Sequence, residues 1–457
     1  MPADDVLSSQ KPIESIDGGI VNSRALTHAS VVDLFGRYSY ELPIDVPELD
    51  SQLNILYGEN GAGKTTILNV VHNAISHAAG RGHKTKIAQI PLKMFKMRFN
   101  GDIELNIYRQ ETFAATFSME LKVSSRVLGQ VDFVAKDGKV PTESDLSDQQ
   151  DEFTALVRST LGLDSYFLGD ERTLDSDIFT DDDDDTELLR INNEFLRFAA
   201  RRDLKREPAR NSQLLLAMER AKQWARSQAL SGANIGSENA NTIYAQVVRQ
   251  LSTEPTYDET IDPLAEQVLR ELITQLASRS ADQSEFGLIP SIDASEFLKG
   301  LHDALPERRP LIVKLLQPYV DGIRARLDAM EGLYSLLKAF TQSLNSFLID
   351  KEVRFDIRRG VVVLDNNGAD LSPEKLSSGE KQLLMLLCNL IISRQRPSLF
   401  LIDEPELSLN VKWQRKLIPA LLACTSGSQI QLIMATHSIE LLTGYRDNVI
   451  RLPFGVE

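Results

Sequence analysis

The sequence contains very little cysteine and no long run of hydrophobic residues. Its 457 residues include two cysteines, Cys388 and Cys424, which excludes a disulfide framework and a zinc or iron–sulfur cluster held by cysteines of one chain. The longest apolar stretch, residues 383–392, is interrupted by Asn389 and is too short to span a bilayer. Residues 1–5 are acidic and lack the hydrophobic region of a secretory signal. These absences predict a cytoplasmic protein without a membrane partner.

A net positive charge is also missing, because the formal net charge is −15 at pH 7 and the pI is near 5.0. A uniformly basic nucleic-acid-binding protein is therefore excluded, since phosphate neutralisation needs clustered Lys and Arg. One local cluster exists: the segment Arg197–Arg226 holds nine basic residues and three acidic ones. This segment is either a solvated helix face, paired with the acidic residues that precede it, or a surface that binds DNA.

The acidic residues before that segment are concentrated in residues 170–187, which hold ten acids and one Arg. Five of the acids are consecutive, Asp181–Asp185. Such a run is typical of a solvated loop. It could also bind divalent ions, imitate DNA or dock a basic effector.

Residues 58–65 read Gly-Glu-Asn-Gly-Ala-Gly-Lys-Thr and lie between an expected strand at 54–57 and an expected helix at 65–76. They match the pattern G-x-x-x-x-G-K-[ST] in full. The glycines let backbone N–H groups wrap a phosphate, and the helix N-terminus adds a dipole that favours anions. Lys64 brings positive charge to the β- and γ-phosphates, and Thr65 offers a hydroxyl to Mg²⁺. The loop therefore predicts a phosphate-binding site that includes Mg²⁺.

An acidic pair follows an apolar strand expected at 398–402. Asp403 is placed to bind Mg²⁺, directly or through water, and Glu404 is placed to polarise an attacking water molecule. Such a pair is only moderately specific alone, but together with the glycine-rich loop it strongly indicates phosphoryl chemistry.

Two further segments belong to the same pattern. Residues 376–382, Leu-Ser-Ser-Gly-Glu-Lys-Gln, precede an apolar helix, so Ser377 is either a simple helix cap or part of an anion site. His437 follows a strand expected at 429–435 and could reach a γ-phosphate, although a lone His is more often structural. Its position after Glu404 favours the functional interpretation.

The remaining apolar patterns predict the fold. Period-two alternation predicts strands at 95–99 and 103–108, and a long helix carries apolar residues at heptad spacing. The heptad positions are Val320, Ile323, Leu327, Met330, Tyr334, Leu337, Leu344 and Leu348, with Thr341 as the interruption. This helix is either coiled-coil-like or an ordinary bundle helix with a core stripe.

Helices and strands alternate after the long helix. They are a hairpin at 352–364, a helix at 380–393, the strand at 398–402, a helix at 413–423 and a last strand at 429–435. The alternation predicts an α/β fold with a mostly parallel sheet and a β-rich flank, interrupted by a helical, partly coiled-coil-like insertion. The expected boundaries are a leader at 1–27, an N-terminal lobe at 28–185, the insertion at 186–345 with a loop and short helices over 227–262, and a C-terminal lobe at 346–457.

The order of these motifs resembles the ABC-type ATPase superfamily: a glycine-rich Walker A loop, a Leu-Ser-x-Gly-Glu signature, a Walker B acid pair, a D-loop and a switch His. Transporter subunits are less similar, because they keep Walker A and the signature closer than Gly58 and Ser377 are here. A helical insertion in that gap resembles the Rad50/RecF/SMC group. The forms at 376–382 and 403–409 look most like OLD-type proteins and the stand-alone ATPases of anti-phage systems such as PARIS and Septu. The resemblance covers residues 28–110 and 345–457.

The resemblance implies a role for each matching residue. Nucleotide binding falls to Gly58, Asn60, Gly61, Gly63, Lys64, Thr65 and Thr66, with Mg²⁺ held by Thr65 and Asp403. Ser377 and Gly379 would contact the γ-phosphate of ATP bound to another copy, and Glu404 would be the catalytic base with His437 as the switch. The pattern departs from the family at Ser378, which replaces a Gly, and at Asn410, which replaces the D-loop Asp.

Two family contacts are not fixed by the motifs. The Q-loop glutamine is either Gln89 or a residue equivalent to it at Asp170–Arg172, after the strand-like segment 166–168. The residue that stacks on adenine is either Tyr38 or Tyr40.

The resemblance implies an enzyme that hydrolyses ATP only when two copies meet head to tail, as a dimer or as a larger ring of dimers. OLD-type proteins continue into a TOPRIM nuclease domain, whereas this chain ends twenty residues after His437 and shows no nuclease motif. We therefore expect a sensor or scaffold subunit that controls a separate effector, a nuclease, in anti-phage defence. The alternative is a RecF/SMC-like ATPase of DNA repair or recombination that binds DNA through Arg197–Arg226, and a transporter subunit is a third class.

Overall fold

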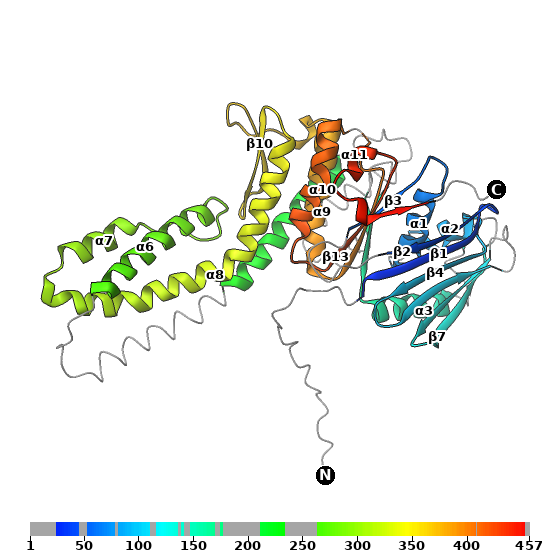
Figure 1. The fold of residues 1–457 in the computed structure, drawn as a ribbon, viewed down its shortest axis with the longest axis horizontal. Helices are drawn as coiled ribbons and strands as arrows, with labels where there is room; N and C mark the ends of the chain where they lie inside the picture. Colours follow the sequence, from blue (N-terminus) through cyan, green and yellow to red (C-terminus); the bar gives the residue numbers. More distant parts are fainter. Residues whose placement is uncertain are drawn as a thin grey trace, which may run out of the picture.

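A computed structural model describes residues 24–44, 53–77, 81–109, 116–135, 139–140, 147–169, 174–176, 211–233, 263–407 and 409–452. Within these residues a head built from two sheets and several helices carries a long helical extension (Figure 1). No helix in these ranges is both long and apolar enough to cross a membrane.

The central sheet of the head is mostly parallel, as the sequence predicted. Its strand order is β14 (Val449–Arg451), β3 (Leu53–Tyr57), β13 (Ile430–Thr436), β12 (Ser398–Asp403), β8 (Asp164–Leu168) and β9 (Leu174–Ser176). Only β9 runs antiparallel to its neighbour. Every residue of β12 and β13 is buried, because a parallel sheet is covered on both faces.

The expected order of strands needs one correction. The strand predicted to be the last, β13, is followed by β14, which adds to the sheet beside β3. Three residues are too few to give a period-two signal, so the sequence pattern did not reveal this strand.

The predicted β-rich flank is a second, antiparallel sheet. Its strand order is β2 (Tyr38–Pro43), β1 (Leu26–Leu34), β4 (Met94–Phe99), β5 (Ile103–Tyr108), β6 (Phe117–Val123) and β7 (Arg126–Phe133). Buried and more exposed residues alternate along β4 and β6, as expected for a sheet with one covered face. Because β1 begins at Leu26, the last two residues of the expected leader belong to this sheet, while residues 1–23 lie outside the described ranges.

The two sheets enclose α1 (Lys64–Ile75) in one apolar core. Leu399 and Leu401 of β12 face this core, whereas Phe400 and Ile402 of the same strand face a second core. The second core includes α9 (Ser378–Ile392) and α10 (Val411–Thr425). Successive side chains of β12 point to opposite faces of the central sheet, so the sheet separates the head into two packed layers.

Smaller elements complete the head. They are α2 (His83–Gln89), α3 (Ser147–Leu161), which packs on β7, α11 (Ile439–Leu442), the hairpin β10 (Lys351–Asp356) and β11 (Gly360–Asp365), and single turns of 3₁₀-helix at Pro373–Lys375, Ser393–Gln395 and Arg446–Asn448.

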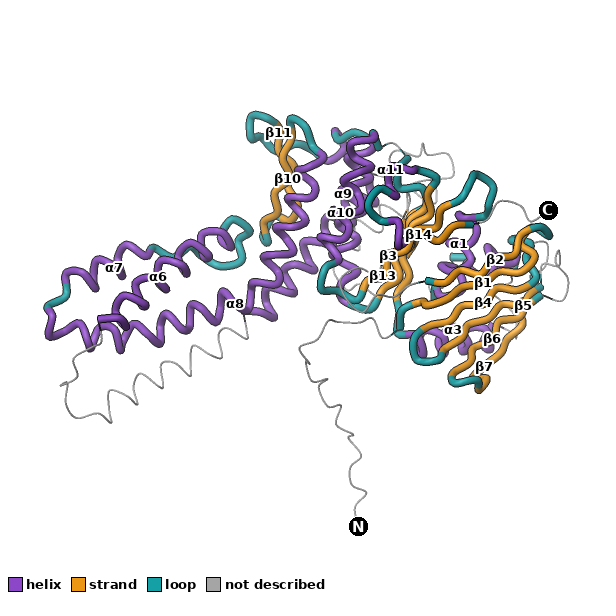
Figure 2. The backbone as a smooth tube through the Cα atoms, viewed as in Figure 1, coloured by secondary structure: helices purple, strands orange, loops and turns teal. Residues whose placement is uncertain are grey.

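The extension consists of α6 (Pro263–Ser284), α7 (Ala294–Asp303) and the first part of α8 (Arg309–Phe347). One further turn of 3₁₀-helix, Pro306–Arg308, lies in the extension before α8. Figure 2 shows α8 running from the far end of the extension into the head. A further helix at 211–233 packs in the head against the second half of α8. Residues 227–233, at the start of the segment expected to be a loop with short helices, continue this helix.

The apolar stripe of α8 is buried as its heptad spacing predicted, but by two different partners. Val320 and Leu327 pack against α6, whereas Leu337 and Leu344 pack into the core of the head. The stripe is therefore that of a bundle helix and not a coiled-coil seam with one partner. Thr341 fits the stripe because its hydroxyl donates to the carbonyl of Leu337, 2.9 Å away, which satisfies the buried oxygen within the helix.

A single side chain joins the two sheets. Gln431 of β13 is fully buried, and its amide oxygen accepts from the Leu26 N–H (2.9 Å) while its amide nitrogen donates to the Leu26 carbonyl (2.8 Å). The side chain thereby continues the hydrogen-bond pattern of a strand across the space between the sheets.

We predict that Gln431→Leu lowers the free energy of unfolding by about 2–3 kcal/mol, because both main-chain groups of Leu26 lose their partner in a buried place. Urea unfolding measures this loss. Gln130→Leu, at an exposed position of β7, is the matched control and should change stability little. Equal stability of the two variants would contradict the prediction.

Candidate nucleotide-binding site

Three of the predicted motifs meet at one edge of the central sheet. β13 lies between β3 and β12, with Tyr57 paired to Thr436 and Ala435 paired to Asp403. Because parallel strands end at the same edge, the loop after Tyr57, the segment that begins with His437, and the acid pair lie side by side. Adjacent strands are about 4.8 Å apart, so the loop and the acid pair are separated by roughly 10 Å. That distance leaves room for a triphosphate and a metal ion between them.

The glycine-rich loop has the shape of a phosphate cradle. Gly61 and Gly63 have φ angles of 86° and 87°, in the left-handed region that favours glycine. A Cβ atom on Gly63 would lie 2.7 Å from the Leu34 side chain, so even alanine would crowd this turn. Gly58 is buried, whereas Asn60 and Gly61 are exposed. Gly61 and Gly63 therefore let the backbone of the loop approach a ligand closely.

Lys64 and the N-terminus of α1 supply positive potential at the loop. Lys64 is only 5% exposed, and its ammonium donates to the carbonyls of Gly58 (2.8 Å) and Glu59 (3.0 Å). The first turn of α1 contains no acid, and its N-cap Gly63 offers no side-chain acceptor. The helix N-terminus thus keeps its affinity for anions. Thr65 is exposed at this end and Thr66 is partly exposed, which fits a cofactor site for Mg²⁺ and nucleotide.

The acid pair occupies two contrasting environments. Asp403 ends β12 and is 2% exposed, whereas the Glu404 side chain is 23% exposed. Glu404 has a φ of 44°, which is unfavourable for a residue with a side chain, and its N–H donates to the Ala435 carbonyl at 2.9 Å. Backbone strain of this kind is concentrated at functional sites, where the surrounding structure imposes it.

His437 is held between two carboxylates. Its Nδ1 lies 3.4 Å from an oxygen of Glu404 and 3.3 Å from an oxygen of Glu406. Glu406 is buried and also accepts from the Thr436 hydroxyl (2.5 Å) and from the His437 N–H (3.1 Å). Sequence reasoning assigned Glu406 no role, although it stands in the acid-rich segment 403–406. In the structure, Glu406 positions His437 beside Glu404.

The signature segment forms a helix cap on the surface. Ser377 is the N-cap of α9, in a capping box in which its hydroxyl accepts from the Glu380 N–H and the Glu380 carboxylate accepts from the Ser377 N–H. Burial opposes ionisation of Glu380, but Lys351 at 2.8 Å and the Ser377 N–H outweigh it, so the pKa of Glu380 lies below its usual value. Ser377 and Ser378 are exposed and Gly379 is buried.

Asn410, one of the two departures from the family pattern, has a local structural role. Asn410 is the N-cap of α10, and its side chain accepts from the Trp413 N–H at 3.0 Å.

Of the two Q-loop candidates, Gln89 ends α2, while Asp170–Arg172 lies outside the described residues. The parallel pairing of β8 with β12 brings the end of β8, directly before that second candidate, to the edge of the site.

The aromatic residue beside the loop is not one that the sequence indicated. Tyr40 is 5% exposed and belongs to the core, so its ring is closed to adenine, and Tyr38 stacks on it with ring centroids 5.8 Å apart. Phe35 lies in the turn between β1 and β2, is 45% exposed, and comes within 3.9 Å of where a Cβ of Gly63 would stand. No residue spacing connects Phe35 with the loop, so only the fold reveals the contact.

The described part of the basic segment is engaged within the molecule. Residues 197–210 and Asp181–Asp185 lie outside the described ranges. Arg220 is buried, Lys222 pairs with Glu219 at 2.5 Å, and Arg226 donates to main-chain carbonyls of the hairpin turn. These contacts do not join the three side chains to the acids of 170–187, so the choice between a solvated helix face and a DNA surface stays with residues 197–210.

The parallel sheet, the cradle at residues 58–65, the acid pair and the signature helix together define a P-loop ATPase of the ABC type. The chain belongs to the AAA_21 family, described as "AAA domain, putative AbiEii toxin, Type IV TA system", whose model matches residues 165–443. The matched region includes the signature, the acid pair and His437.

Curated relatives cover part of the chain. The phosphonates import ATP-binding protein PhnC of Bordetella parapertussis is 31% identical over 159 residues, which is 33% of this chain and 59% of that protein. The PhnC 1 protein of Rhodopseudomonas palustris is 27% identical over 157 residues, 34% of this chain and 56% of that protein. The chain thus spans less than two thirds of the length of these relatives.

Solved structures align over most of the chain at low similarity. The Smc head domain with an extended coiled coil, bound to the C-terminal domain of ScpA, from Pyrococcus furiosus has a TM-score of 0.41 and 10% identity, covering 94% of this chain and 93% of that one. The Smc head with a coiled coil and joint from Pyrococcus yayanosii has a TM-score of 0.38 and 14% identity, covering 94% and 95%. These values are too low to bear on function.

We predict that Glu404→Gly raises the free energy of unfolding by about 1 kcal/mol relative to Glu404→Gln, because only glycine tolerates the positive φ without strain. Both variants lack the carboxylate, so the comparison isolates the backbone. Urea unfolding of the two proteins measures the difference. Equal midpoints would show that the turn carries no strain.

Proposed function

We propose that this chain hydrolyses ATP at the edge formed by β3, β13 and β12. The observation that carries the proposal is the convergence of the cradle, Asp403, Glu404 and His437 on that edge. Glu404 would orient and deprotonate the attacking water, and His437, positioned by Glu406, would hold that carboxylate and reach the γ-phosphate. Mg²⁺, held by Thr65 and Asp403, would neutralise charge on the β- and γ-phosphates.

We further propose that one copy is incomplete as an enzyme. Ser377 and Ser378 are exposed at the N-terminus of α9, a helix of 15 residues, and the capping box fixes their backbone for a ligand outside the chain. A head-to-tail dimer, alone or within a ring of dimers, would bring this segment and Gly379 to the γ-phosphate bound by the other copy. Asn410 caps the N-terminus of α10 in its own chain, so the dimer would not depend on a D-loop carboxylate.

We predict that Glu404→Gln protein dimerises in saturating Mg-ATP and stays monomeric without nucleotide, because binding is kept while hydrolysis is lost. Light scattering after size-exclusion chromatography measures the mass. Ser377→Arg in the same background adds bulk at an exposed position and should prevent the dimer while ATP binding persists. A Glu404→Gln protein that remains monomeric with Mg-ATP would refute the head-to-tail arrangement.

The ATPase would control a separate effector, a nuclease, in defence against phage. The description of its family names a putative toxin of a type IV toxin–antitoxin system, which supports an activity shared with a second gene product. Within the described residues, the group of three or more His, Cys, Asp or Glu side chains that could hold a metal ion is His72, His83 and Asp175, apart from the Mg²⁺ ligands proposed above. We place the effector function on another polypeptide as part of this proposal.

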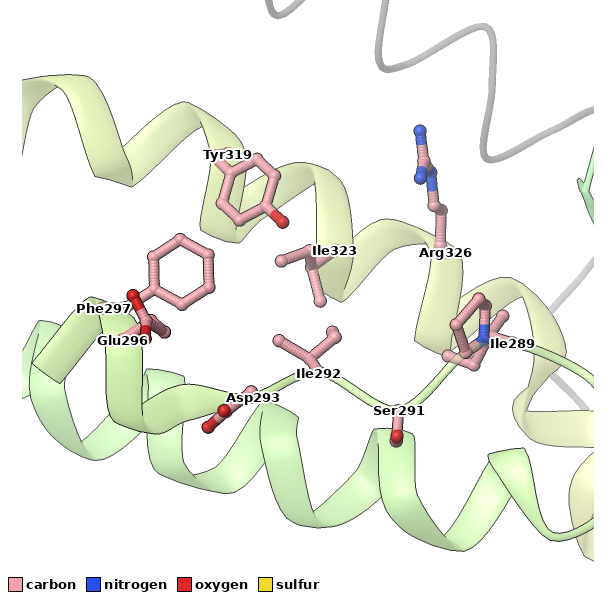
Figure 3. A pocket seen from close by; sticks show the side chains of 10 residues that line it. Ile289, Ser291, Ile292, Asp293, Glu296, Phe297, Tyr319, Ile323 and Arg326 are labelled. Atoms are coloured by element: carbon pink, nitrogen blue, oxygen red, sulfur yellow. The ribbon is translucent and has the colours of Figure 1, made fainter.

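The extension offers a surface on which such a partner could dock. A groove of about 530 Å³ between α7 and α8 is lined by the ring pair Phe297 and Tyr319, with centroids 5.3 Å apart, and by isoleucines of both sides. Figure 3 shows Glu296 at the end that holds Phe297 and Arg326 at the opposite end. This charge distribution fits an apolar segment of the effector that carries a basic residue at one end and an acidic residue at the other.

Recovery of partners from the native host tests the effector role. Tagged Glu404→Gln protein with Mg-ATP should retain a stoichiometric protein with a nuclease or toxin fold, identified by mass spectrometry. Arg326→Glu and Tyr319→Glu, at exposed groove positions, should abolish its recovery, whereas Leu305→Glu, exposed elsewhere on the extension, should not. Recovery of salt-sensitive DNA without such a protein would instead favour the RecF/SMC-like function.

A further inference from the structure

A cluster of three side chains behind the glycine-rich loop is not used by the proposed ATPase mechanism. His72 of α1 is fully buried, His83 of α2 is 5% exposed, and the side chain of Asp175 in β9 is 23% exposed. Each offers one atom able to bind a metal, and these atoms all lie within 4.8 Å of one another. Three separate elements thus bring two imidazoles and a carboxylate together.

The outer nitrogen of each imidazole is already fixed. The amide nitrogen of Asn73 donates to the Asn69 carbonyl at 2.7 Å, so the amide oxygen of Asn73 is the atom that faces Nδ1 of His83 at 2.8 Å. Nδ1 of His83 therefore carries the proton, and Nε2 keeps its lone pair. Nδ1 of His72 likewise meets the Ser165 hydroxyl at 2.9 Å. Metal-binding histidines show this arrangement, in which a second group orients the ring.

The inner nitrogens point into the cluster. Among the described residues, Nε2 of His72 is buried without a hydrogen-bond partner, and its nearest acceptor is Oδ2 of Asp175 at 3.6 Å. Nε2 of His83 lies 3.2 Å from the Ser76 hydroxyl, a group that can rotate away. A buried nitrogen without a partner costs free energy, and a bound cation would remove that cost.

We propose that His72 Nε2, His83 Nε2 and Asp175 Oδ2 bind a single transition-metal ion of the Zn²⁺ class, with a water molecule as the fourth ligand. Bond lengths of 2.0–2.2 Å place neighbouring ligands of a tetrahedral ion roughly 3.3 Å apart, so the spacing within 4.8 Å needs a contraction of up to about 1.5 Å. Two nitrogens and one oxygen suit zinc better than Mg²⁺ or Ca²⁺, which prefer oxygen ligands.

Two positively charged side chains contact Asp175 and affect the affinity of the proposed site for a metal ion. Arg81 donates to Oδ1 of Asp175 at 3.1 Å and to the Ser176 carbonyl at 2.7 Å, so it can stay and orient the carboxylate. Lys86 donates to Oδ2 at 3.0 Å and competes directly with a metal ion. The Lys86 side chain is 46% exposed on a flexible stem, and its ammonium can move into water when the ion binds.

The site is separate from the one proposed for Mg²⁺. His72 follows Lys64 by eight residues on α1, which places it about 12 Å along the helix from the phosphate cradle. An ion there would join α1, α2 and β9 into one unit and would hold the helix that carries the cradle against the edge of the sheet.

Calorimetric titration of chelator-treated, nucleotide-free protein with Zn²⁺ tests the proposal. We expect saturable binding of one ion per chain and a rise in Tm of about 5 °C at a hundredfold excess over Kd. His83→Gln and Asp175→Asn should each abolish both effects, and Asn73→Ala should weaken binding about 10- to 100-fold. Co²⁺ should show the visible absorption of a four-coordinate ion with these ligands.

Two controls separate this site from other metal binding. His28→Gln removes a histidine of the antiparallel sheet that pairs with Glu41 and should leave Zn²⁺ binding unchanged. Neutralising Asp181–Asp185 to Asn should also leave it unchanged. Unaltered binding in His83→Gln and Asp175→Asn, or no saturable binding in the parent protein, would overturn the proposal.

Lys86→Met keeps the proposal falsifiable even if the ligand variants fold poorly. If Asp175 binds a metal ion, loss of the competing ammonium raises Zn²⁺ affinity several-fold. If the cluster is only an ion-pair network, the variant is less stable with or without Zn²⁺, and its Zn²⁺ affinity is the same as that of the parent protein.

Discussion

The parallel pairing of β13 with β3 on one side and β12 on the other is the constraint on which this molecule depends. The pairing brings together segments from residues 58–65, 403–407 and 436–438, which are more than 300 residues apart at the extremes. A slip of the register would turn each strand over and move Asp403 out of its buried place. The burial of both faces of β12 and β13 fixes that register, so the same apolar residues that stabilise the head also set the geometry of the site.

Local chemistry explains what could be predicted from the sequence. The glycine-rich loop, the acid pair and the apolar strands have patterns that depend on neighbours in the chain, and the structure has the α/β fold with the parallel sheet and β-rich flank that they indicated. Glu406, Phe35 and the cluster of His72, His83 and Asp175 could not be found that way, because their partners come from distant segments. The stripe of α8 was visible, but which surfaces bury it is a property of the folded chain.

The signature segment shows that two interpretations of one motif need not exclude each other. Ser377 is an ordinary helix cap, with the reciprocal hydrogen bonds of a capping box to Glu380. The same bonds hold its backbone in one conformation at an exposed helix end, which is what an anion from another molecule would require. Lys351 adds to this order, because its contact with Glu380 connects the start of β10, and through it the end of α8, with the signature.

Because α8 packs on α6 at one end and in the head at the other, only some changes in the length of α8 are compatible with both contacts. A helix turns by about 100° for each residue, so one residue added between Val320 and Leu337 would rotate the groove of the extension by that angle around the helix relative to the head. Seven residues return the stripe to within about 20° of its former direction. Descendants of this chain that keep both surfaces can therefore lengthen or shorten the extension only in steps that preserve the helical phase.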